Sequence, residues 1–111
     1  MSAAPDQPIA VFITTPNKEE AARLADKLVE RRLAACVQIL PAMESVYRWQ
    51  GKIERQDEIL LIAKTVNSKF AELEREVRAL HSYETPEIVA VPLTTLSEPY
   101  LQWLNASVTT D

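Results

Sequence analysis

Glycine is nearly absent from this chain of 111 residues, with Gly51 as the only example. Dinucleotide-binding and phosphate-binding loops need several glycines, because the backbone must approach the phosphate groups closely. The sequence therefore predicts neither a Rossmann fingerprint nor a P-loop. A lone glycine is instead suited to one tight chain reversal, where a residue must tolerate a positive φ angle.

Cysteine and histidine also occur once each, as Cys36 and His81. One cysteine cannot form an intrachain disulfide, which suits a reducing compartment, and paired-cysteine zinc spacings are absent. A single histidine without a nucleophile elbow supports no Ser-His-Asp triad. We therefore expect a cytoplasmic protein, and no motif specifies a catalysed reaction.

Basic residues and long apolar runs are scarce as well. Lys and Arg number 12 against 16 Asp and Glu, which gives a net charge of −4. No basic cluster is present and no apolar run reaches the roughly 20 residues of a membrane span, so we expect neither nucleic acid nor a membrane as partner.

Residues 1–8 are small and polar with no apolar stretch typical of a secretory signal. We expect residues 1–8 to form a disordered tail and residues 9–111 a single domain.

Hydrophobic periodicity predicts the order strand, helix, strand, strand, helix, strand, with one further helix. The first helix has Glu20 placed as in a capping box. The order predicts an α+β fold, a ferredoxin-like βαββαβ sandwich with an extra C-terminal helix. The expected elements are a strand over 9–14, a helix capped by Asn17, arms over 34–49 and 52–65, a helix capped by Asn67 or Ser68, a strand over 87–93 and a helix after Ser97.

The two arms form one long β-hairpin that turns at residues 50–52. Each arm can extend on the order of 45 Å at roughly 3.3 Å per residue. A compact chain of this length has a diameter of only about 35 Å. Pro41 lacks an N–H group for the ladder and predicts a bulge or an edge position. The hairpin must therefore bend, project beyond its own subunit, or do both.

The sheet is also expected to be apolar on both faces. Residues 59–62 are all apolar, and residues 9–13 and 35–39 are largely so. With both main helices on one face, a monomer would leave on the other an apolar patch larger than soluble monomers usually show. The sequence therefore predicts an oligomer that associates through its sheet.

Few residues are candidates for chemistry. Cys36 is either a soft thiolate ligand for copper or zinc, a redox thiol, or a small apolar residue packed in a strand. His81 is either a metal ligand or a residue favoured at a helix C-terminus by the helix dipole. Lys64 lies in an apolar strand, so its amine must reach solvent or pair with Glu84 or Glu87.

Aromatic residues and the acidic run near the turn have structural interpretations that we favour. Core or interface packing is favoured over a ligand cage for five aromatic residues, Tyr47, Trp49, Tyr83, Tyr100 and Trp103. The run over residues 54–58 is typical of a solvated hairpin end.

Several motifs together resemble the CutA divalent-cation-tolerance family, over about residues 9–106. They are AACV at 34–37 followed by Pro41, SVYRWQGK at 45–52, Lys64-Thr65, HSYETPEI at 81–88 and YLQWL at 100–104. The resemblance implies a ferredoxin-like fold, a compact homotrimer, a non-enzymatic protein and a role in tolerance of divalent metals, especially copper.

The resemblance also implies metal ligands, because relatives bind copper or other divalent ions through cysteine and histidine. Cys36 and His81 are the matching positions here, with no obligatory cofactor and with copper or another divalent cation as the expected ligand. The chain departs from the family pattern at Ser82, where the loop usually has proline. Thr14 and Leu80 stand where some relatives have a second cysteine and a second histidine, so a site within one chain is poor in ligands.

Three hypotheses follow. The first is a homotrimer that responds to divalent metal ions and binds copper weakly. The second is a small-molecule sensor resembling the PII signalling proteins. Its anionic ligand would lie in an intersubunit cleft formed by Trp49, Lys64, Tyr83, Glu84 and Glu87. The third, ranked last, is an enzyme with His81 as general base and Lys64 as electrostatic stabiliser.

Overall fold

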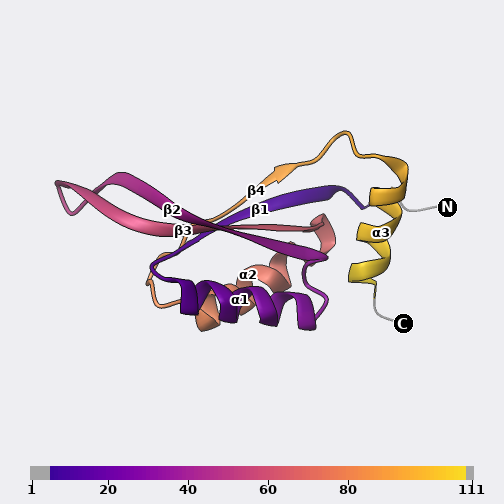
Figure 1. Cartoon of the computed structure of the whole chain (residues 1–111), viewed down its shortest axis with the longest axis horizontal. Helices are drawn as coiled ribbons and strands as arrows, with labels where there is room; N and C mark the ends of the chain where they lie inside the picture. The colour runs from indigo at the N-terminus through magenta and orange to yellow at the C-terminus, as the bar shows by residue number, and fades with distance from the viewer. Residues whose placement is uncertain (1–5, 110–111) are drawn as a thin grey trace.

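The strands and helices follow the predicted order. The computed structural model describes residues 6–109, in which helices α1 and α2 lie on one face of a four-stranded sheet (Figure 1). The sheet order is β2-β3-β1-β4, and all three neighbouring pairs are antiparallel. The predicted ferredoxin-like α+β fold is therefore confirmed. Its elements are β1 (Pro8–Thr15), α1 (Lys18–Glu30), β2 (Cys36–Trp49), β3 (Lys52–Val66), the 3-10 helix η1 (Asn67–Lys69), α2 (Phe70–Leu80), β4 (Ile88–Pro92) and α3 (Glu98–Val108).

The predicted tail over residues 1–8 needs correction at its end. Residues 1–5 lie outside the described residues. Asp6 accepts hydrogen bonds from the backbone N–H and the hydroxyl of Ser68, Gln7 donates to the carbonyl of Leu93, and Pro8 begins β1. The domain therefore includes at least residues 6–8, because these residues connect the start of β1 to η1 and to the end of β4.

The structure confirms the predicted cap of α1 but contradicts the capping-box role of Glu20 and the predicted cap of α2. Asn17 caps α1 as expected, with its side-chain oxygen 2.9 Å from the backbone nitrogen of Glu20. The Glu20 side chain, however, is buried and bonds to the loop after α2. Neither Asn67 nor Ser68 caps α2, which follows η1 without a side-chain cap. Asp6 instead satisfies the backbone N–H of Ser68 in η1.

The β2–β3 hairpin projects beyond the helical layer (Figure 1). Trp49 pairs with Lys52, so Gln50 and Gly51 alone form the turn, and both have positive φ angles, of 51° and 80°. The register shifts between Leu40 and Met43, which confirms the predicted bulge at Pro41. The molecule measures 52 × 24 × 23 Å, so the hairpin length is accommodated mainly by projection.

The two faces of the sheet differ in how they are covered. Val11, Ile13 and Leu61 lie on the face that α1 and α2 bury. On the other face α3 covers only the end near Val66, through Leu104 and Val108. Val89 on this face is 51% exposed, and Leu40 is 42% exposed. The predicted uncovered apolar face is therefore present. Among residues 6–109, no helix is long and apolar enough to cross a membrane.

The turn provides the first testable prediction. A Cβ atom at Gly51 would contact nothing within 4 Å, but the φ angle of +80° is unfavourable for any residue with a Cβ. We expect Gly51→Ala to lower the free energy of unfolding by about 1–2 kcal/mol, through backbone strain alone. Chemical denaturation measures this loss. Gly51→Asn is the matched control and should lose less, because asparagine tolerates a left-handed conformation; equal losses would contradict the argument.

Candidate functional site

A cleft lies where the hairpin leaves the body of the domain. Its volume is about 660 Å³, and it lies between the projecting strands and the loop that joins α2 to β4. We call it the hairpin cleft. Its lining residues are Thr14, Ser45, Val46, Tyr47, Trp49, Gln56, Glu58, Ser82, Tyr83, Glu84, Thr85 and Glu87. Four of the five predicted cleft residues, Trp49, Tyr83, Glu84 and Glu87, are among them. A larger cavity, about 790 Å³, lies beside α3 and contains none of the predicted site residues.

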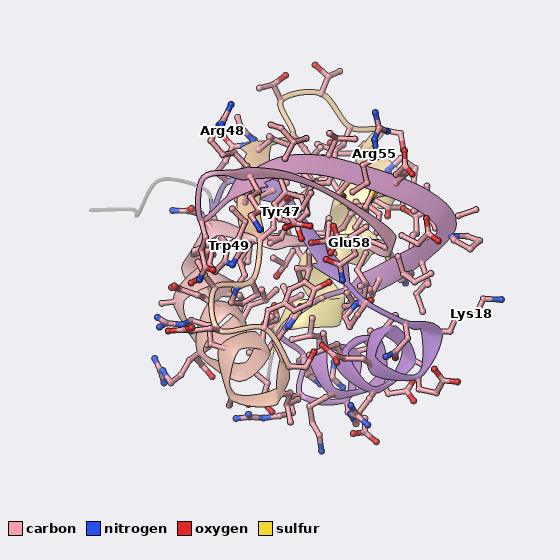
Figure 2. All side chains as sticks on the ribbon, turned by 90° about the vertical axis from the view of Figure 1, so that its left-hand side faces the viewer. Lys18, Tyr47, Arg48, Trp49, Arg55 and Glu58 are labelled. Carbon is pink, nitrogen blue, oxygen red and sulfur yellow. The ribbon has the colours of Figure 1, made fainter. Side chains whose placement is uncertain are left out.

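A chain of hydrogen bonds crosses one wall of the hairpin cleft. The Tyr47 hydroxyl donates to Gln56 Oε1 at 2.8 Å, and Gln56 Nε2 donates to the Tyr83 hydroxyl at 2.9 Å. The Tyr83 hydroxyl donates in turn to Glu58 Oε2 at 2.8 Å. Figure 2 views this end of the molecule, with Tyr47 and Glu58 near the middle and Arg48 and Arg55 pointing outward. This chain of hydrogen bonds therefore connects β2 and β3 to the loop after α2, and it ends on the buried carboxylate of Glu58.

The environment of Tyr83 keeps its hydroxyl protonated. Burial is the main cause that raises the pKa of Tyr83 above its ordinary value, and the hydrogen bond and negative charge of Glu58 raise it further. A phenol in this state remains a hydrogen-bond donor across the neutral pH range. The direction of the hydrogen-bond chain, from Tyr47 toward Glu58, is therefore maintained at neutral pH.

His81 anchors the loop behind the cleft and uses both of its ring nitrogens. Nε2 lies 2.7 Å from the carbonyl oxygen of Thr14, to which the ring must donate because a carbonyl only accepts. Nδ1 accepts from the backbone N–H of Tyr83 at 3.0 Å and lies 3.2 Å from Glu20 Oε2. Glu20 Oε2 also accepts from the backbone N–H of Ser82 at 3.1 Å. A metal ion could bind His81 only by replacing one of these contacts.

Cys36 and Lys64 lie together elsewhere, under α3. They are directly opposite each other in the β2–β3 ladder and so share a face of the sheet. Cys36 Sγ lies 3.7 Å from the Tyr100 hydroxyl, and Lys64 Nζ lies 5.6 Å from the centre of the Tyr100 ring. Burial, followed by the contact with Cys36, raises the pKa of Tyr100 to about 12. Lys64 thus lies over an aromatic ring and does not line the hairpin cleft with Glu84 and Glu87 of the same chain.

The structure does not bring Cys36 and His81 together within one chain. Cys36 pairs with Lys64 of β3, and Lys64 in turn pairs with Ala10 of β1. His81 instead contacts Thr14, which lies four residues further along β1. Four strand residues span about 13 Å. Within residues 6–109, no three His, Cys, Asp or Glu side chains are placed to hold one metal ion.

Sequence reasoning missed two acidic residues of this region. Glu58 belongs to the run interpreted as a solvated hairpin end, yet it is only 7% exposed. Glu20 was assigned to a capping box, yet it holds the loop after α2. A signal for Glu58 was available, because it lies next to the fully apolar run 59–62, where a solvated residue is not expected. No local signal identifies Glu20, since its partners lie 62 residues away.

The fold and cleft define a ferredoxin-like α+β protein with a projecting hairpin and a polar, aromatic cleft at its base. A family profile described as "CutA1 divalent ion tolerance protein" matches residues 9–107. The chain therefore belongs to the CutA1 divalent ion tolerance family.

Individual relatives agree with this assignment. "Divalent-cation tolerance protein CutA" of Thermus thermophilus is 49% identical over 95 residues, which are 86% of this chain and 92% of the relative. "Protein CutA, chloroplastic" of Arabidopsis thaliana is 46% identical over 99 residues, which are 89% of this chain but only 54% of that relative's length. The crystal structure of CutA1 from Oryza sativa superposes with a TM-score of 0.91 at 42% identity, covering 96% of this chain and 97% of that one.

The hydrogen-bond chain leads to a second prediction. We expect Tyr83→Phe to lower the free energy of unfolding by about 1–3 kcal/mol, because buried Glu58 loses its donor. Tyr47→Phe makes the same chemical change at the exposed end of the chain and should cost less than about 1 kcal/mol. Urea denaturation of both variants checks the difference. Equal losses would mean that the buried carboxylate does not depend on Tyr83.

Proposed function

We propose that this protein contributes to tolerance of divalent metal ions as a non-enzymatic homotrimer that binds copper weakly. The single observation that carries the metal role is membership of the divalent ion tolerance family. The Thermus relative is named for the same property. The family and the Thermus relative are named for tolerance and for no reaction, which favours a protein without catalytic activity.

Association into an oligomer is supported by two features of the fold, and the number of three subunits is proposed from the family resemblance alone. The sheet face beyond α3 carries exposed apolar side chains such as Leu40 and Val89. The projecting hairpin adds Val46, Trp49 and Ile53, each at least half exposed. Apolar surface of this extent is unusual on a soluble monomer, and packing against further copies of the chain would bury it.

Copper is proposed to bind through Cys36 and His81. Thiolate and imidazole both suit copper, and thiolate favours the Cu(I) state. Because these residues lie on different parts of one chain, a site that uses both must combine Cys36 of one subunit with His81 of another. His81 must then exchange a present hydrogen bond for the metal, which fits weak binding. We place this protein in the cytoplasm because a single cysteine suits a reducing compartment.

The sensor hypothesis is not favoured by the family match. It places Lys64 in a cleft between subunits, whereas within one chain Lys64 lies over Tyr100 and does not line the hairpin cleft. The ionisable residues that line the cleft are Glu58, Glu84, Glu87 and two tyrosines. An anion would be repelled there, so an anion sensor is not part of the proposal.

Metal titration of single variants tests the ligand assignment. We expect Cys36→Ser and His81→Ala each to weaken Cu(I) affinity by at least about tenfold, since each removes one ligand. Competition with a chromophoric Cu(I) chelator under anaerobic conditions measures the affinity.

The control for Cys36→Ser is Tyr100→Phe, which changes the surroundings of the sulfur but keeps the thiol. It should bind copper like the unchanged protein. Unchanged affinity in both ligand variants would overturn the assignment, and a loss in Cys36→Ser alone would remove His81 from the site.

A further inference from the structure

We propose that helix α3 is a lid over Cys36, which must leave the sheet before a metal ion reaches the Cys36 sulfur. The inference rests on the proposed role of Cys36 as a copper ligand and adds a control on access to it. It is based on the position of α3 over the sulfur and on the few contacts that hold α3 to the rest of the domain.

The Tyr100 side chain of α3 covers the sulfur of Cys36. Cys36 and Lys64 are opposite each other in the β2–β3 ladder, and Tyr100 lies over both. Its hydroxyl is 3.7 Å from Cys36 Sγ, and its ring centre is 5.6 Å from Lys64 Nζ. Cys36 is half-buried in this arrangement. A metal ion shared with His81 of another subunit needs free space beside the sulfur, and α3 takes up part of that space.

The apolar contact between α3 and the sheet is small and separate from the main core. The two buried residues of α3, Leu104 and Val108, pack with Ala35 and Val66, whereas α1 and α2 pack into the main core. Figure 1 shows α3 at the end of the sheet opposite the hairpin turn. Segments with few buried apolar contacts open at a lower free energy than the whole protein unfolds. We therefore expect α3 to leave the sheet while the rest of the domain stays folded.

The loop over residues 93–97, which joins β4 to α3, is suited to be the hinge. Its start is fixed, because the N–H of Leu93 donates to the carbonyl of Pro8 and the carbonyl of Leu93 accepts from Gln7. Within residues 6–109, residues 94–96 make no hydrogen bond, and Ser97 accepts hydrogen bonds only from α3. The backbone angles of residues 94–97 can therefore change without the loss of a hydrogen bond to the domain.

One hydrogen bond from a charged group holds the far end of α3. Arg32, just after α1, donates from Nη1 to the carbonyl of Ser107 at 3.2 Å. Ser107 is in the last turn of α3, where carbonyl groups lack partners within the helix and a cation is favoured by the helix dipole. This turn contains no basic residue of its own. The neighbouring Arg31 pairs instead with Glu76 of α2, so Arg32 alone of the two holds the lid closed.

The reaction rate of the Cys36 thiol with dithionitrobenzoate tests the lid in the full chain and without copper. We expect Val108→Ala to raise the rate about tenfold, because it weakens the apolar contact of α3. Arg32→Gln should raise it about threefold, because it removes the hydrogen bond to Ser107. Below the unfolding transition the rate should change little with urea, since the departure of one helix exposes little surface.

Two matched variants control for a general loss of stability. Val77→Ala makes the same truncation in the main core, and Arg31→Gln removes the ion pair with Glu76; both should react like the unchanged protein at low urea. If Val108→Ala does not fold, the two arginine variants carry the comparison alone.

Unchanged rates in Val108→Ala and Arg32→Gln would overturn the lid, because the thiol would then be open already. An equal rise in the controls, or a steep dependence of the rate on urea, would also overturn it, because exposure would then need global unfolding. The assay contains no copper, so its failure is distinguishable from a failure of Cys36 as a copper ligand, which the Cu(I) affinity of Cys36→Ser reports.

Discussion

The structure depends on one constraint, which is that the pairing of β2 with β3 continues beyond the body of the domain. The body can cover only the half of the ladder that packs against β1, α1 and α2. The other half is held by cross-strand hydrogen bonds and by the turn at Gln50 and Gly51. The bulge after Leu40 separates the two halves. A chain of this size thereby forms a compact core and an extended arm from the same pair of strands.

The hairpin cleft is a consequence of this arrangement. It forms at the point where the arm leaves the body, between the strands and the loop after α2. The loop needs its own anchors there, and His81 and Glu20 hold it against β1 and α1. Tyr83 then reaches across to Glu58 on β3. The histidine suggested by the family as a metal ligand thus also positions the wall of the cleft.

The sequence correctly predicted the structural features that are determined by single residues and their close neighbours in the chain. Gly51 identified the turn, Pro41 the bulge and Asn17 the start of α1, because each acts through its own backbone or that of close neighbours. Glu58 and Glu20 were misplaced for the opposite reason, and the contact of Lys64 with Tyr100 was missed for it too. Their surroundings come from segments at least 25 residues away in the chain: the loop after α2 for the two acids, and Tyr100 of α3 for the lysine. Local pattern therefore specified the fold but not the chemistry of the cleft.

The central proposal is that the arm and the uncovered sheet face are surfaces for association into a trimer. Multi-angle light scattering of the purified chain at micromolar concentration tests it most directly, because it gives the mass without assuming a shape. The account predicts a single species of three times the chain mass of 12.5 kDa. A single species of 12.5 kDa would contradict it.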